Sequence, residues 1–264
     1  MANSVKYAYL SIHMPHKQSA YKKNYLTDVV VKINFPIILE LSEGQPTAFQ
    51  KEIQVDYPIL EPLQEIEFKI ENKGLSVLQH KSNRTLWRFR NRENTEYIEL
   101  DYGSLAYIVK KYTDYTTFKR KAESIFNQFF KIYSNILITR LGLRYINKLD
   151  LGGTDYFNWS DYLNVNLIKK IDFYSDKTKI KRLITISELA PDEETVLNFK
   201  YGIFNSTYPS PVVKKEFILD YDCYTLIQFE KENIIAKIDT YHRYIKENFE
   251  TSITTALREI LNHE

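Results

Sequence analysis

Residues 136–148 read Ile-Leu-Ile-Thr-Arg-Leu-Gly-Leu-Arg-Tyr-Ile-Asn-Lys and form the most distinctive stretch of the chain. Alternate positions share a character here, which is typical of a strand that buries one face. One face would carry Leu137, Thr139, Leu141, Leu143 and Tyr145, and the other Arg140, Gly142 and Arg144. We therefore predict a strand over 136–148 with an apolar face toward the core and a basic face away from it.

The basic face of this strand has two interpretations. Arg140 and Arg144 would lie about 13 Å apart at ~3.3 Å per residue, and a guanidinium grips phosphate or carboxylate groups bidentately. Gly142 between them leaves the backbone open to close approach. Alternatively, each arginine pairs with a carboxylate on an adjacent strand, such as Glu99 or Asp101. Arg140, Arg144 and the adjacent Tyr145 are the first candidates for a ligand-binding site.

A second basic stripe lies in residues 86–92. Trp87 and Phe89 alternate with Arg88, Arg90 and Arg92, which predicts a strand with one aromatic and one basic face. A turn at 91–95 would join it as a hairpin to a strand over 96–110. Arg88 and Arg90 therefore join the candidate ligand-binding residues, and Tyr102 and Tyr107 nearby could stack a base. The alternative is a solvated face balanced by Glu96 and Glu99.

The remaining pattern predicts an α+β fold with mostly antiparallel strands and two amphipathic helices. Further strands are expected over 28–39, bent at Pro36, and over 65–71, 181–188, 195–204 and 216–228. Apolar residues at three- and four-residue steps predict helices over 115–134 and 231–261, and a short helix is expected over 46–53.

The chain has two halves of opposite charge, which meet at Gly152-Gly153. Residues 1–150 hold 22 Lys+Arg and 16 Asp+Glu, and residues 151–264 hold 14 and 18, which gives +6 and −4. The segment Glu96-Tyr-Ile-Glu-Leu-Asp-Tyr resembles Glu216-Phe-Ile-Leu-Asp-Tyr, and a helix follows each. We therefore expect N- and C-terminal β-rich halves, either as two β-β-β-α pseudo-repeats or as one continuous domain, with a cleft between halves as the default ligand site.

Composition excludes several classes of protein. The chain is 44% hydrophobic and 27% charged, unlike a disordered chain, and no run approaches the ~18 apolar residues of a membrane helix. Its seven glycines form neither a dinucleotide-binding fingerprint nor a P-loop. A single cysteine and an N-terminus without the layout of a signal peptide favour a cytoplasmic location.

The segment Arg140-Leu-Gly-Leu-Arg-Tyr-Ile-Asn resembles the signature of an uncharacterised, sporadically distributed bacterial protein family with an Arg-x-Gly-Leu-Arg-Tyr-Ile-Asn motif. The Leu-Asp-Tyr strand at Asp220 and the closing helix with His242 are similar as well. Thr27-Asp28 replaces the Pro-Pro pair common in that family. The resemblance implies no established activity, and the patchy distribution implies a place in defence-associated or toxin–antitoxin gene clusters.

Catalytic and metal-binding candidates are weak. Asp56 with Glu65, Glu67 and Lys69 loosely resembles a metal-dependent nuclease site. Asp220 and Asp222 share a strand face, where ion pairing is the alternative to metal binding. Cys223 and His242 are expected to be packing residues, and His13 and His16 lack further ligands at zinc spacing.

These patterns favour a non-enzymatic binding protein that engages a protein partner or a small anionic ligand. No cofactor, metal or membrane partner is expected. The alternative is a metal-dependent nuclease or a nucleic-acid-binding protein that uses the basic stripe.

Overall fold

The computed structural model describes residues 21–70 and 77–263, and it confirms the α+β class. Its centre is one nine-stranded antiparallel sheet with the order β2-β3-β4-β5-β1-β6-β9-β8-β7. The strands are β1 (Leu26–Asn34), β2 (Ile59–Ile70), β3 (Val77–Arg90), β4 (Glu96–Asp101), β5 (Ser104–Val109), β6 (Arg140–Asp150), β7 (Leu183–Leu189), β8 (Val196–Ile203) and β9 (Glu216–Thr225).

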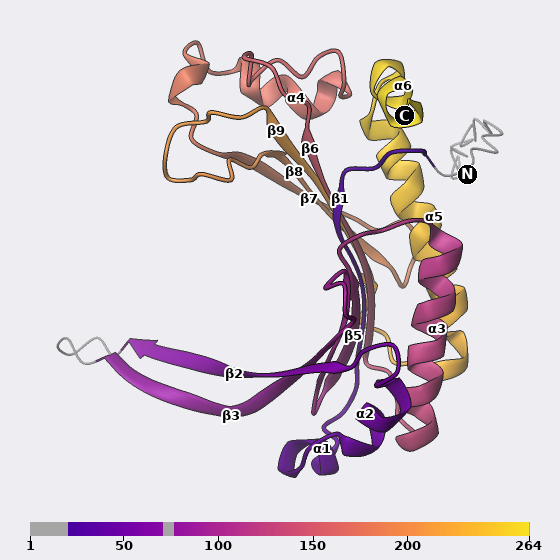
Figure 1. Cartoon of the computed structure of the whole chain (residues 1–264). Coiled ribbons are helices and arrows are strands. Elements are labelled where there is room, and N and C mark those ends of the chain that lie inside the picture. Colours follow the sequence, from indigo (N-terminus) through magenta and orange to yellow (C-terminus); the bar gives the residue numbers. More distant parts are fainter. Residues whose placement is uncertain (1–20, 71–76, 264) are drawn as a thin grey trace, which may run out of the picture.

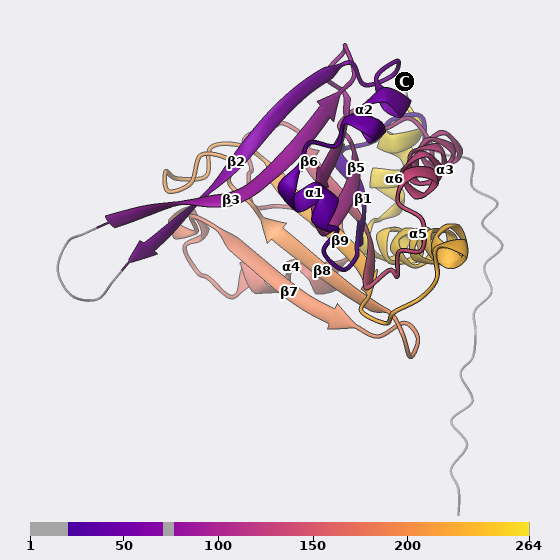
Figure 2. The same cartoon turned by 90° about the horizontal axis from the view of Figure 1, so that it is seen from below.

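The long helices cover one face of this curved sheet, and the hairpin of β2 and β3 projects away from it (Figures 1 and 2). The helices are α1 (Leu39–Glu43), α2 (Thr47–Ile53), α3 (Tyr115–Ile132), α4 (Val165–Asp172), α5 (Ile234–Ser252) and α6 (Thr255–Asn262). Asp114 caps α3 by accepting a hydrogen bond from the backbone N–H of Thr117 at 2.8 Å. Within the described residues, every helix is too short or too polar to cross a bilayer.

The strand order has an internal symmetry about the central pair β1 and β6. Outward from the centre, one side reads β1-β5-β4-β3 and the other β6-β9-β8-β7, while β2 extends the first side by one strand. A long helix follows β5 on one side and β9 on the other. The topology therefore contains two units of one plan, β-α-β-β-β-α, that share a single sheet.

This symmetry corrects the predicted repeat. The two similar segments lie in β4 and β9, but the counterpart of β9 is β5, so that alignment is wrong by one strand. The units divide between α3 and β6, whereas Gly152-Gly153 follows β6. Both glycines have positive φ, at +66° and +89°, as a tight turn requires.

Two further predictions about elements are wrong in detail, and one helix was not predicted. Residues 96–110 form two strands, because Asp101 accepts hydrogen bonds from the backbone N–H of Gly103 and the hydroxyl of Ser104 and so closes a turn. The stretch after Trp159 contains α4, which the sequence pattern did not reveal. The closing helix breaks at Ile253, which bridges to Leu163, and Thr254 caps a separate helix α6.

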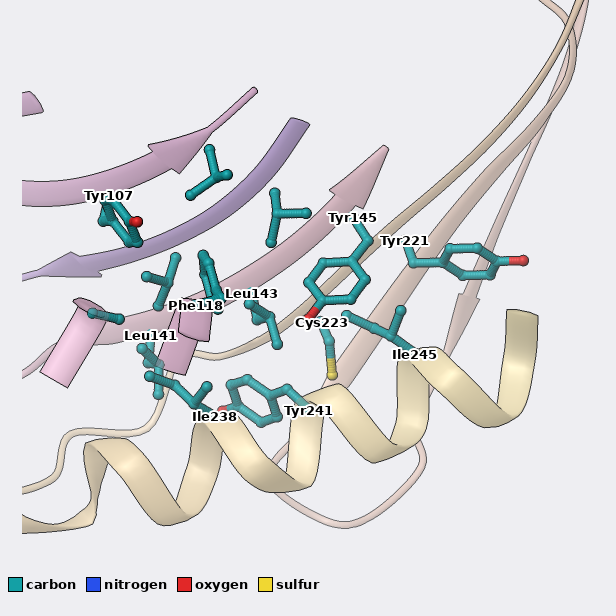
Figure 3. Packing of buried hydrophobic residues seen from close by; sticks show 14 of the residues in the cluster. Tyr107, Phe118, Leu141, Leu143, Tyr145, Tyr221, Cys223, Ile238, Tyr241 and Ile245 are labelled. Atoms are coloured by element: carbon teal, nitrogen blue, oxygen red, sulfur yellow. The ribbon is translucent and has the colours of Figure 1, made fainter. Parts of the chain in front are cut away.

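The core lies between the sheet and the two long helices. Ile238, Tyr241 and Ile245 of α5 are buried against the apolar faces of β6 and β9 (Figure 3). The sheet face that carries Leu141, Leu143 and Tyr145 faces the helices, as predicted, and we call it the inner face. We call the opposite side, on which Arg140 and Arg144 lie, the open face.

Gly202 of β8 is required by the backbone of its neighbour. Its φ is +141°, and a Cβ atom would stand 1.9 Å from the carbonyl oxygen of Leu183 in β7. Gly202→Ala should therefore lower the free energy of unfolding by about 2–4 kcal/mol in a urea titration. Gly103→Ala is the matched control, because its Cβ would meet only ordinary contacts from 3.5 Å outward. Equal stability of the two variants would contradict this account.

Candidate functional site

The two motif arginines are bound to carboxylates of the neighbouring strand β9. The guanidinium of Arg144 donates to both carboxylate oxygens of Asp220, at 2.8 and 2.6 Å, and Asp220 is buried. Arg140 reaches Asp222 at 3.5 Å and lies over the ring of Tyr224, 4.6 Å from its centroid. Ion pairing was one of the two interpretations, but the predicted partners were wrong, because β6 neighbours β1 and β9 and not the strand of Glu99 and Asp101.

Gly142 has a structural role in the motif. A Cβ atom at this position would stand 2.6 Å from a terminal nitrogen of Arg140. The absence of a side chain thus leaves room for the Arg140 guanidinium to lie across the strand toward Asp222 and Tyr224. The spacing of arginine and glycine is accounted for by contacts inside the chain.

Arg88 and Arg90 lie on the same open face but at a distance from the motif. Strands β4, β5 and β1 separate β3 from β6, which puts the two pairs of arginines about 19 Å apart. Arg88 pairs with Glu99 at 2.6 Å and Arg90 with Glu61 at 2.5 Å. The four arginines therefore do not converge on one ligand.

The two tyrosines expected beside this stripe both pack against the core, and Tyr102 lies partly buried in the turn between β4 and β5. Tyr107 is fully buried on the inner face, so it cannot stack a base. Its hydroxyl donates to Glu96 at 2.8 Å, and Lys121 pairs with the same carboxylate. One interpretation had Glu96 and Glu99 balance the arginine stripe. Glu99 does so by pairing with Arg88, whereas Glu96 serves the core.

Tyr145 lies on the inner face of the sheet, opposite to Arg140 and Arg144, because side chains alternate along β6. There a cavity of about 290 Å³ lies between β1 and β6, residues 112–116, and helices α5 and α6. Its walls are mostly aromatic and aliphatic. They comprise Tyr21, Lys23, Asn24, Tyr25, Leu26, Tyr112, Thr113, Asp114, Tyr115, Thr116, Tyr145, Asn147, Leu149, His242, Ile245, Lys246, Phe249, Glu250 and Leu261.

A tyrosine–histidine pair forms the polar part of this cavity. The hydroxyl of Tyr145 lies 3.0 Å from Nδ1 of His242, within hydrogen-bonding distance. The imidazole stacks on the ring of Tyr115 with 3.7 Å between centroids and 3° between planes. Tyr115 in turn donates to Asp239 at 2.7 Å, and the ring of Tyr112 lies 5.7 Å from that of Tyr145. These contacts fix the imidazole in orientation.

Burial keeps these groups uncharged. It lowers the pKa of His242 to about 4, and the charge of Lys246 adds to the effect. It raises the pKa of Tyr112 to about 12 and that of Tyr145 well above the usual range. The part of the cavity formed by Tyr112, Tyr145 and His242 is therefore neutral near pH 7.

Charged groups are confined to the remaining lining, and most have partners inside the chain. Glu250 accepts from Tyr21 at 2.7 Å and pairs with Arg258 at 2.9 Å. Lys23 lies over the ring of Tyr25, and Asp114 is the cap of α3. The cavity thus offers apolar contact and neutral hydrogen-bonding groups, and most of its charged side chains are engaged within the chain.

His242 was expected to be only a packing residue, and within residues 112–115 only Thr113 or Asp114 was expected to have a role, as the N-cap of the helix that follows. The signal was available in Tyr112-Thr-Asp-Tyr115, where two aromatic residues flank a helix cap. What it could not supply was the distance, since Tyr145 and His242 lie 97 residues apart and meet only through the β6–α5 packing.

The other candidates are placed as follows. Asp220 and Asp222 are ion-paired, and Cys223 is fully buried, which raises the pKa of its thiol. Among the described residues, no three His, Cys, Asp or Glu side chains gather as a metal site. His13 and His16 lie outside the described residues, as do the side chains of Glu65, Glu67 and Lys69, so the nuclease site stays a prediction.

The Arg144–Asp220 pair makes a prediction about stability. Arg144→Ala leaves a buried carboxylate without its bidentate donor and should lower the free energy of unfolding by about 2 kcal/mol. Arg243→Ala is the control. Arg243 and Glu247 form an exposed ion pair with 3.4 Å between nitrogen and oxygen, which should contribute less than about 0.5 kcal/mol to the free energy of unfolding. A urea titration measures both variants, and a loss at Arg144 no larger than at Arg243 would refute the structural role.

His242 makes a prediction about pH. The unfolded state takes up a proton on this side chain below about pH 6.5, whereas the folded state does so only near the folded pKa of about 4. Stability should therefore fall as pH drops through this window, by at most about 3 kcal/mol from this group. In His242→Gln, the urea-derived free energy should lose less between pH 6.5 and 4 than in the unsubstituted chain; parallel curves would contradict burial of a neutral imidazole.

Comparison of the chain with protein-family models and with curated proteins finds no match. The resemblance carried by the Arg140–Asn147 segment thus stays a prediction.

Proposed function

We propose that this chain is a binding protein whose inner cavity takes a small, neutral, aromatic molecule with one hydrogen-bonding group. The observation that carries the proposal is the cavity itself, which combines apolar walls with the Tyr145–His242 pair. Concave, largely apolar sites with a few fixed polar groups are the usual form of small-molecule sites.

The size of the cavity limits the ligand. A cavity of about 150 Å³ lined by apolar side chains takes benzene. The volume of about 290 Å³ thus has room for a molecule of about two rings. Tyr112, Tyr145 and Phe249 are ring partners along the wall, and stacked or edge-on contacts between rings are favourable.

The electrostatics limit the ligand further. Burial raises the pKa of Tyr112 and Tyr145 and lowers that of His242, so the same surroundings disfavour a charged ligand. A hydroxyl or carbonyl group on the ligand can exchange a hydrogen bond with the phenol or the imidazole.

The proposed class, a binding protein, is the one expected from the sequence, but the proposed ligand site is the inner cavity and not the arginines of the open face. An anionic ligand at Arg140 and Arg144 would have to displace Asp222 and Asp220, which already occupy those donors. A neutral ligand in the cavity would not have to break an ion pair at the Tyr145–His242 pair. For this reason the cavity supports the proposal better than the open face.

Thermal unfolding with added 2-naphthol, indole, benzoate or inorganic phosphate tests the proposal. At about 100 times its dissociation constant, a ligand stabilises by about 2.7 kcal/mol, which is several degrees in Tm for a chain of this size. We expect this shift with 2-naphthol or indole and none with benzoate or phosphate, which are anions near pH 7.

Leu26→Trp, which fills the cavity, should abolish the shift, and Leu60→Trp is the control. Leu60 is partly buried in β2, outside the cavity lining. A shift with phosphate alone would favour the arginines, and an equal naphthol shift in both tryptophan variants would refute the cavity as the site.

A further inference from the structure

The strand β7 forms one edge of the sheet and pairs only with β8. Figure 2 shows it as the outermost strand on that side. Three of its apolar side chains are exposed: Ile184 at 36%, Ile186 at 59% and Leu189 at 44%. The strand contains no proline, lysine or arginine. Such an edge presents unpaired backbone groups and apolar side chains to another strand.

The opposite edge is protected. The strand β2 carries Pro62, which removes a backbone donor, and its register with β3 shifts between Gln64 and Ile66. Proline and register irregularities are common means of blocking edge-to-edge pairing. The contrast between the edges indicates that β7 is left open for pairing.

We propose that β7 pairs antiparallel with β7 of a second copy of this chain, about a two-fold axis at Thr185. In that register, a residue n positions before Thr185 lies opposite the residue n positions after it in the other copy. Ile184 then lies opposite Ile186, and Arg182 lies opposite Glu188, each twice by symmetry. All four side chains are at even positions, so they lie on the same face of the joined sheet.

Charge complementarity selects this occupant. Neither Arg182 nor Glu188 makes an ion pair within the part of the chain that the structure describes. Arg182 lies over the ring of Tyr208, 4.1 Å from its centroid, and its Nε donates to the carbonyl of Phe204. Glu188 accepts from Asn198 at 3.1 Å. Both contacts are made on the side of β8, so one positive and one negative group lie near the two ends of β7, where a second copy would supply the opposite charge to each.

The pairing is isologous, so it closes with two copies. It adds backbone hydrogen bonds along β7 and covers Ile184 and Ile186. The open faces of the two sheets would then continue into one another.

Light scattering after size exclusion, over a range of protein concentrations, tests the proposal. We expect twice the chain mass for the unsubstituted protein. Ile186→Lys should give a monomer, while Ile59→Lys, at an exposed position on the protected edge β2, should remain a dimer.

A charge exchange tests the register. Arg182→Glu and Glu188→Arg should each raise the dissociation constant at least tenfold, because each sets like charges opposite one another. The double variant should restore dimerisation, which separates the ion pair from any loss of the Tyr208 contact.

Four outcomes would overturn the proposal: a monomer at about 0.1 mM, a dimer that survives Ile186→Lys, no rescue in the double variant, or open-ended assembly, which a two-fold axis forbids. The first of these leaves the ligand-binding proposal intact, because the cavity lies on the inner face between β1, β6 and α5.

Discussion

The antiparallel pairing of β1 and β6 is the contact on which the rest of the structure depends. Val31 lies opposite Leu143 in this pair, and both side chains are fully buried against the helices. Each strand opens one of the two similar units, so their hydrogen bonds join both units into one sheet. Without this pairing, each unit would expose a sheet edge and half of the core that α3 and α5 cover.

The same pairing determines the chemistry of the two faces. Because side chains alternate, residues of β6 at odd positions enter the core and those at even positions reach the open face. Tyr145 therefore belongs to the cavity, while Arg144, one residue away, belongs to the ion pairs with β9. A motif that looks continuous in the sequence thus serves two separate sites.

Much of the fold could be predicted from local patterns. The helix at Tyr115 and the alternation around Arg88 and Arg144 were visible because burial on one side imposes a period on the sequence. The partners of the arginines could not be predicted, since strand order depends on long-range pairing that a local pattern does not contain. Glu99 and Asp220 are both carboxylates within expected strands, so the sequence does not distinguish them as partners of Arg144. The position of β9 beside β6 makes Asp220 the partner.

The cavity shows the same limit more strongly. Its walls come from widely separated parts of the chain, and of the lining residues only Tyr145 and Asn147 belong to the arginine motif. The amide N–H of Lys23 donates to the carbonyl of Leu261 at 3.0 Å, and Tyr21 donates to Glu250, so two segments more than two hundred residues apart meet at the cavity. A molecule bound there would contact both segments and so stabilise their association. Local unfolding of either segment would then lower the affinity of the cavity for its ligand, although neither segment lies at the centre of the sheet.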